Sequence, residues 1–260
     1  MKRIDRRAVP PALAGLLAAL LLAAAGCTAA GTGGGQAAGR ARTPQEALQA
    51  AAPDRSGGSF RYTLADPDST GTGVLDPRAG RGLIEINQRE PGDDLVVKTG
   101  FLKIGPDLWT RITPSRRVPG FPVPDKWLRI DPAKVTSTDL LAEFAADPTG
   151  AAALAARTGG VTADPSGYRG TVDLTALGGV ELVPPARVTA LGPKAAAVPF
   201  EAVVDAEQRL SKLTVRVPAA GRAKAYERVS TYGDYGAAAI PAAPTAAIDA
   251  PAGVYDLLNK

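Results

Sequence analysis

The residue types that most catalytic sites use are scarce in this chain. Its 260 residues include no histidine and a single cysteine, Cys27. Without imidazole the chain has no Ser-His or Cys-His nucleophile pair, no histidine general base and no histidine ligand for zinc. An enzyme of this composition would depend on carboxylates, Ser, Tyr, Lys or a hard metal ion. We therefore expect no enzymatic activity, no catalytic residues, no cofactor and no metal site.

One acidic segment has a spacing that is found in some active sites. Asp66-Pro67-Asp68-Ser69-Thr70-Gly71 has the form Asp-x-Asp-x-Thr, similar to the nucleophile loop of haloacid-dehalogenase-type phosphatases. Such a loop follows a parallel strand and opens a helix, whereas here Asp76-Pro77 leads into another expected strand. As a calcium loop the segment lacks its closing glutamate, because the twelfth position is Pro77. A hairpin turn is favoured, since Asp, Pro, Ser and Gly are turn residues.

The N-terminal residues have the pattern of an export signal. Four basic residues within the first seven positions precede an apolar run from Leu13 to Cys27. This run is shorter than the ~20 apolar residues of a membrane-spanning helix, and it ends in small residues, as signal-peptidase sites do. Residues 1–26 are therefore expected to be a signal peptide that is removed. The pair Arg6-Arg7 leaves twin-arginine export open beside the general secretion route.

The small residues before Cys27 suggest a specific modification. Ala24-Ala25-Gly26-Cys27 resembles the lipobox of bacterial lipoproteins, in which the cysteine thiol receives a diacylglycerol and the new amino terminus is acylated. Cleavage after Ala23-Ala24-Ala25 by an ordinary signal peptidase is the alternative. Each buried methylene contributes ~0.8 kcal/mol, so two or three acyl chains together hold a protein on a membrane. We expect lipidation of Cys27 and a position on the outer face of the cytoplasmic membrane.

The charge of the processed chain gives no reason to expect a nucleic acid partner. The full chain has a net charge of +4. Residues 1–26 carry four basic groups and one acidic group, so their removal leaves a net charge of +1. A nearly neutral chain lacks the basic surface that nucleic acid binding requires.

Beyond the signal, composition divides the chain into three parts. Residues 27–42, rich in Gly, Ala and Thr, are expected to be a flexible tether. Thr43-Pro44-Gln45-Glu46 predicts the start of a helix that ends before Pro53, because Thr43 and Glu46 can form a capping box. Residues 43–240 are expected to be the folded domain. The Ala/Pro-rich residues 241–260 are expected to be an extended tail.

Apolar residues then recur with a period of two, as in Phe60, Tyr62 and Leu64. The clearest predicted hairpin joins Val198–Val204 to Leu210–Val217. This alternation predicts an antiparallel meander with one apolar and one polar face. Helical structure is predicted within 136–160. Further strands are predicted at 84–87, 95–98, 100–104, 108–112, 126–130, 168–174, 187–190 and 225–232.

Five segments stand out together: Leu108-Trp109-Thr110, Lys126 to Asp131, Tyr168 to Asp173, Val198 to Glu207 and Tyr232 to Gly236. In their order, spacing and position behind a lipobox they resemble the LppX/LprAFG group of actinobacterial lipoproteins, which belongs with the LolA- and LolB-like carriers. The resemblance runs from about residue 60 to residue 244. It implies a half-barrel with helices against its concave side and an apolar cavity for the acyl chains of lipids or lipoproteins. This family has no signature catalytic residues.

The expected fold class is therefore α+β, a strongly curved antiparallel β-sheet in a LolA-like half-barrel with a few helices packed on its concave face. The residues that alternation places on the inner face, as a candidate ligand cavity, are Phe60, Tyr62, Ile84, Ile86, Leu95, Val97, Leu141, Phe144, Phe200, Leu213 and Val215. The expected function is binding of a hydrophobic small molecule or lipid, as a carrier or chaperone anchored to the membrane by its N-terminal lipid. The alternative is a non-catalytic interaction or sensory module of the cell envelope with a filled core.

Overall fold

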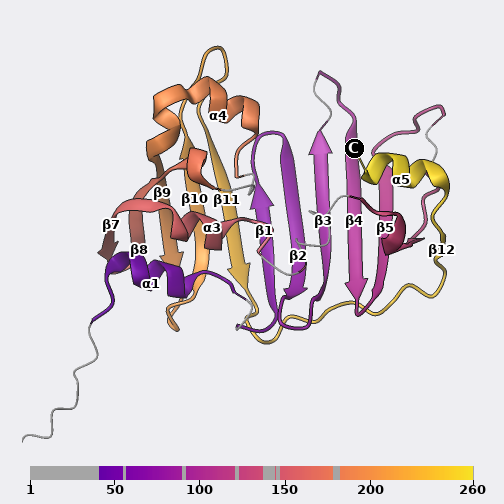
Figure 1. The fold of residues 1–260 in the computed structure, drawn as a ribbon, viewed down its shortest axis with the longest axis horizontal. Coiled ribbons are helices and arrows are strands. Elements are labelled where there is room, and N and C mark those ends of the chain that lie inside the picture. The colour runs from indigo at the N-terminus through magenta and orange to yellow at the C-terminus, as the bar shows by residue number, and fades with distance from the viewer. Residues whose placement is uncertain are drawn as a thin grey trace, which may run out of the picture. The chain divides into compact units, whose positions relative to one another are not determined.

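Twelve strands form one open sheet in the part of the chain that the structure describes (Figure 1). The computed structural model describes residues 41–54, 57–89, 92–120, 123–136, 144, 147–177 and 182–259. The strand order is β12-β6-β5-β4-β3-β2-β1-β11-β10-β9-β8-β7, so β12 and β7 are the two edges. Neighbouring strands pair antiparallel, except β12 and β6, which are parallel. The α+β class and the mostly antiparallel sheet are confirmed.

The strands are β1 Phe60–Ala65, β2 Ser69–Asp76, β3 Arg81–Arg89, β4 Val96–Ile104, β5 Asp107–Pro114, β6 Leu128–Ile130, β7 Thr158–Asp164, β8 Gly167–Val172, β9 Val198–Val204, β10 Leu210–Val217, β11 Tyr226–Gly233 and β12 Ile248–Asp249. The α-helices are α1 Pro44–Ala51, α3 Ala151–Ala156, α4 Pro185–Leu191 and α5 Ala252–Leu258. Short 3₁₀ helices are η1 Pro132–Lys134, η2 Leu174–Ala176 and η3 Gly192–Ala197.

Helix α1 begins as its sequence predicts. The Glu46 N–H donates to Thr43 Oγ1 at 3.2 Å, and the Thr43 N–H donates to Glu46 Oε2 at 2.7 Å. These two bonds form the predicted capping box, with Pro44 in the first turn. The helix ends at Ala51, before Pro53, and its Leu48 side chain is buried. Because so short a helix is not stable alone, the burial of Leu48 against the sheet holds it in place.

Two predicted segments of the folded domain have a different secondary structure in the protein. The second half of the segment predicted as helix within 136–160 contains α3, but Thr158–Asp164 is strand β7, paired with β8. The β-branched Thr158, Val161 and Thr162 favour a strand, and the register shifts between Gly159 and Thr162. The segment 187–190, predicted as a strand, lies in α4, because Pro185 occupies the first helical turn.

A single apolar cluster joins one face of the sheet to the helices. It contains strand residues such as Ile84 and Phe200 together with Leu48 of α1, Leu154 of α3 and Val254 of α5. In a strand, successive side chains point to opposite faces, so the neighbours of these strand residues face away from the cluster. We call the side of the sheet that carries this cluster the core face, and the opposite side the outer face.

The C-terminal residues belong to this architecture. After β11 the chain crosses the outer face, where Pro241 and Pro244 lie over Leu83 and Leu102. It then adds β12 beside β6 and ends in α5, whose Val254 is fully buried in the core cluster. In the view of Figure 1, α5 is drawn across the upper part of β5. The segment 241–258 thus passes around the β12 edge and contacts both faces of the sheet.

Hydrogen bonds attach α5 to the segment that follows β6. The Asp131 N–H donates to the Tyr255 hydroxyl at 3.0 Å. The Thr136 N–H donates to Asn259 Oδ1 at 2.8 Å, and Asn259 Nδ2 donates to the Lys134 carbonyl at 3.0 Å. The Lys134 ammonium also lies 5.4 Å from the centroid of the Tyr255 ring. These contacts fix the end of the chain against the core face.

Candidate functional site

Most of the predicted inner-face residues lie together in the core cluster. Alternation along β1, β3, β9 and β10 turns them to one side of the sheet. The members that are buried in the cluster are Phe60, Tyr62, Ile84, Phe144, Phe200, Leu213 and Val215. Ile86 and Val97 are partly buried and pack against it. These nine side chains form one continuous apolar surface.

The other three predicted positions are not among these nine. Leu95 precedes β4 and is only partly buried. Leu141 and Cys27 lie outside the described residues.

Aromatic rings gather around Phe60 near the middle of the sheet. The centroid of its ring lies 6.4 Å from that of Tyr62, 6.3 Å from that of Tyr232 and 6.0 Å from that of Tyr235. Tilted pairs at such distances are favourable beyond the area that they bury. The sequence analysis placed Phe60 and Tyr62 here but missed Tyr232 and Tyr235. Alternation along β11 could have indicated Tyr232, whereas Tyr235 follows the end of the strand at Gly233 and has no such signal.

A polar row on β11 interrupts the apolar surface. Arg228, Ser230 and Tyr232 alternate along this strand, and all three are buried on the core face. Arg228 Nη1 lies 3.4 Å from Asp66 Oδ2, and Arg228 Nε has no hydrogen-bond partner in the described structure. The Tyr232 hydroxyl forms a short hydrogen bond with Thr149 Oγ1. The core face thus contains charged and hydroxyl groups as well as hydrocarbon.

Asp147 is attached to this polar row through Thr149. Its carboxylate accepts hydrogen bonds from the Thr149 N–H at 2.9 Å, from Thr149 Oγ1 at 2.7 Å and from the Ala151 N–H at 2.9 Å. Burial nevertheless raises the pKa of Asp147, against the effect of these hydrogen bonds. Burial also raises the pKa of the Tyr232 hydroxyl. Burial therefore shifts the pKa of both groups in the direction that favours the neutral form.

The Asp66 segment forms the turn between β1 and β2, as the sequence indicated. Asp66 Oδ1 accepts hydrogen bonds from the Asp68 N–H at 3.0 Å and the Ser69 N–H at 2.8 Å. Since β1 and β2 are antiparallel and β2 follows directly, the strand-to-helix setting of a phosphatase nucleophile loop is absent from this hairpin. The Asp66 carboxylate therefore stabilises the turn through these hydrogen bonds and also forms the ion pair with Arg228.

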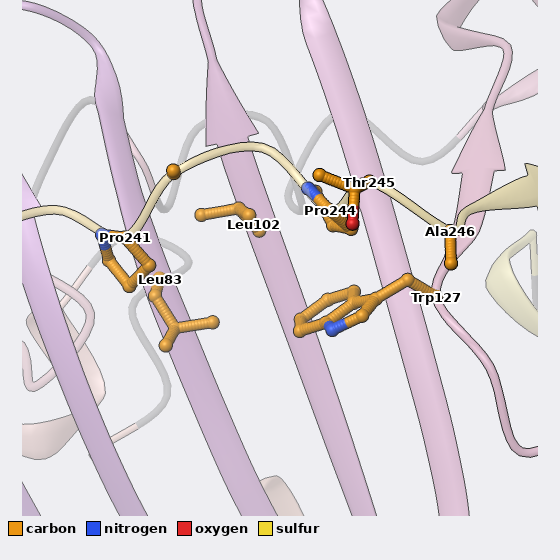
Figure 2. Close-up of a pocket in the computed structure, with 8 residues that line it drawn as sticks. Leu83, Leu102, Trp127, Pro241, Pro244, Thr245 and Ala246 are labelled. Atoms are coloured by element: carbon orange, nitrogen blue, oxygen red, sulfur yellow. The ribbon is translucent and has the colours of Figure 1, made fainter.

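A pocket of about 300 Å³ lies on the outer face, beneath the C-terminal segment (Figure 2). Pro241 and Pro244 lie over the side chains of Leu83 and Leu102, and the Trp127 ring closes one side. Trp127 lies over the sheet at Gly100, where an added β-carbon would be 3.4 Å from its Cη2 atom. The sequence reading missed this pocket, because the Ala/Pro-rich segment that covers it has no periodicity.

A second pocket, of about 440 Å³, lies where three segments meet. Pro67 and Asp68 come from the β1–β2 turn, and Arg187 comes from α4. Lys224 lies in the connection between β10 and β11, and Tyr226 is the first residue of β11. This pocket contains hydrocarbon, an aromatic ring and charged groups of both signs. The sequence offered no local signal for it, since its residues come from three segments that are separated along the chain.

Two kinds of feature, a metal site and a membrane-spanning helix, are absent from the described ranges. They contain no group of three or more Asp, Glu, His or Cys side chains placed to hold a metal ion. Within the same ranges no helix combines the length and the hydropathy that a bilayer crossing requires. Compared with known proteins, the chain matches no family model, and no curated protein is similar enough in sequence to count as a match.

Proposed function

We propose that this protein is a membrane-anchored extracytoplasmic lipoprotein that binds a hydrophobic ligand, a lipid or acyl chain, against the core face of its sheet. In this proposal the sheet is a LolA-like half-barrel, and its helices lie on the concave side. The protein acts as a carrier or chaperone and does not transform its ligand. Its lipidated Cys27 keeps the binding domain beside the source of lipid.

One observation carries the proposal: a broad apolar face is covered by short helices. In the order of the sheet, the core cluster extends over strands from β6 to β8. By contrast, α1, α3, α4 and α5 each have between six and eight residues. Helices of this length depend on packing for their stability. Displacing one of them from the sheet would expose apolar lining at a modest cost, and an acyl chain would replace the lost contacts.

The sequence supplies the second support. The signal-like N-terminus and the Ala-Gly-Cys27 junction are those of an exported, lipidated protein. The flexible tether that composition predicts for residues 27–42 would have an r.m.s. reach of roughly 20 Å, enough for the domain to approach headgroups without being pressed against them.

The test is whether lipid copurifies with the protein. The full chain is expressed in a bacterial host that lipidates exported proteins and is extracted gently from its membranes. Native mass spectrometry then measures additional mass that survives desalting and is not covalent. We expect roughly one bound lipid per chain. Repeated recovery of a chain that carries only its covalent acyl groups would contradict the carrier function.

A filled-core interaction module is the second candidate. It is favoured by the near-complete burial of the predicted lining, with Phe60 and Ile84 each only 1 % exposed and Phe200 2 % exposed. In this case the apolar face is ordinary core, and function resides in a surface that contacts a partner of the cell envelope.

The substitution Val215→Phe distinguishes the two candidates. In a filled core, the larger ring at this buried site costs about 1–3 kcal/mol of folding free energy. In a carrier, the ring occupies ligand space, so the amount of bound lipid falls while the free energy of unfolding of the lipid-free protein changes little. Urea denaturation and lipid extraction, measured on the same preparation, separate these outcomes.

A further inference from the structure

The pocket of about 440 Å³ beside Tyr226 has the features of an anion site. Its lining includes Pro67, Asp68, Pro184, Arg187, Lys224 and Tyr226. Two of these side chains are cationic and one is a carboxylate, so positive charge is in excess. Asp68 itself is exposed.

Arg187 is the central group of the pocket. It is only 9 % exposed, and its Nη2 donates to the carbonyl oxygens of Pro218 at 2.8 Å and Lys224 at 2.5 Å. Its guanidinium carbon lies 5.6 Å from the centroid of the Tyr226 ring. The Nε of Arg187 is buried and has no hydrogen-bond partner in the described structure. A buried cationic donor without an acceptor is costly, and an anionic oxygen would remove that cost.

A second arginine of the same kind lies next to this pocket. Arg228 is two residues beyond Tyr226 on β11, so the two side chains share the core face. It is 8 % exposed, its ion pair with Asp66 is long at 3.4 Å, and its Nε also lacks a partner. Among the described residues, the only buried side-chain nitrogens without partners are these two and the indole nitrogen of Trp109. Two of the three are therefore arginine donors flanking one tyrosine.

The pocket and the apolar face share one side chain, Tyr226. Tyr226 packs against the core cluster, and it is opposite Val217, which is itself buried in that cluster. A ligand with its charged end beside Arg187 would have its hydrocarbon end directed toward the core face. Neither a free inorganic anion nor an uncharged hydrocarbon would use both features.

We propose that the Arg187 pocket binds the phosphate headgroup of an acyl lipid whose chain lies along the core face. This inference rests on the proposed lipid-binding function and narrows its ligand to an anionic amphiphile. Arg187 and Lys224 supply the charge, and Tyr226 separates the headgroup from the apolar lining. Arg187 also closes the β10–β11 connection through its two carbonyl contacts, so headgroup binding and the conformation of this connection are linked.

The test uses the full chain in phosphatidylcholine vesicles and two photoreactive probes. One probe is a twelve-carbon alkyl phosphate with a diazirine at the end of its chain, and the other is the uncharged alkyl alcohol with the same diazirine. The variants are Arg187→Gln, Lys224→Gln and, as a control, Arg222→Gln, an exposed arginine of the same connection. The readout is the probe concentration that gives half-maximal crosslinking to the protein.

We expect Arg187→Gln to raise this concentration about 10-fold and Lys224→Gln about 3-fold for the alkyl phosphate, through loss of charge-assisted hydrogen bonds. Labelling by the alkyl alcohol, and both labels on Arg222→Gln, should match those of the unsubstituted protein. Because Arg187 also holds the connection, Lys224→Gln is the variant that remains informative if Arg187→Gln does not fold.

Other outcomes overturn the proposal in distinguishable ways. Equal labelling by both probes, unchanged in the variants, would reject the headgroup site and leave lipid binding intact. Absence of specific labelling by either probe would reject the headgroup site and the proposed function together. Inhibition by inorganic phosphate at the concentrations at which the alkyl phosphate binds would assign the pocket to the free anion and reject the lipid headgroup.

Discussion

The ring of Tyr62 on β1 lies directly over Gly73 on β2, in the space that a β-carbon at position 73 would occupy. The two residues are opposite each other in the antiparallel register. Tyr62 is 3 % exposed and belongs to the core cluster. Because Gly73 has no side chain, the Tyr62 ring can lie against the backbone of the neighbouring strand and cover it.

Gly73→Ala should therefore destabilise the fold by about 1–3 kcal/mol, because the added methyl group must displace a buried ring. The matched control is Gly233→Ala on β11, where the added β-carbon would have no atom within 4 Å. The free energy of unfolding from urea denaturation measures both. Equal effects of the two substitutions would show that Tyr62 does not lie over Gly73.

Val254→Ala should cost about 2 kcal/mol, since it removes two methyl groups from a fully buried site in α5. Ile248→Ala in β12 is the control, because Ile248 is 42 % exposed and should have an effect close to zero. Chemical denaturation of the full chain checks both values. If Val254→Ala were neutral, the C-terminal helix would not be part of the folded domain.

Asp147→Asn should become less destabilising as the pH rises. Burial raises the pKa of Asp147 in the folded protein, so between the unfolded and folded pKa values the folded state holds more protons than the unfolded state. The parent protein therefore loses stability at Asp147 as the pH rises, whereas the uncharged amide of the variant does not titrate and loses none. Unfolding free energies at several pH values from 4 to 8 measure the difference between variant and parent.

Asp205→Asn is a control for which the stability difference should change with pH in the opposite direction. Although burial opposes it, hydrogen bonds from Arg209 hold the pKa of Asp205 below its usual value. Its contribution to stability is present above the unfolded pKa and is lost as the pH falls through the folded pKa, so this variant should cost more at pH 7 than at pH 4. A pH-independent difference for Asp147→Asn would mean that the carboxyl group is not buried.

Cys27→Ser should abolish N-terminal acylation and move the protein out of the membrane fraction. Cys27 is the only cysteine, so no other thiol can replace it. The mass of the N-terminal peptide reports acylation directly, and membrane fractionation reports its consequence. Thr28→Ser, one position further on, should leave both unchanged. An unmodified N-terminal peptide in the unsubstituted protein would contradict the lipoprotein assignment.

The sequence determined the elements whose signals are local. Thr43 and Glu46 predicted helix α1 because a capping box needs only four consecutive residues. The β9–β10 hairpin was predicted with its exact bounds, Val198–Val204 and Leu210–Val217, because alternation and a short turn specify it. Alternation also placed Phe60, Ile84 and Phe200 on one face, since the period of a strand is fixed by its backbone.

Tertiary structure decided what depends on residues that are distant in the chain. No local pattern brings Arg187 to the carbonyl oxygens of Pro218 and Lys224, or Thr149 to Tyr232, because these contacts join separate elements after they pack. The Ala/Pro-rich segment after residue 240 has no period that predicts its path. That it crosses Leu83 on the outer face and packs Val254 into the core cluster depends on the apolar surfaces that the other elements leave exposed. Periodicity assigns a side chain to a face, whereas only packing selects what that face meets.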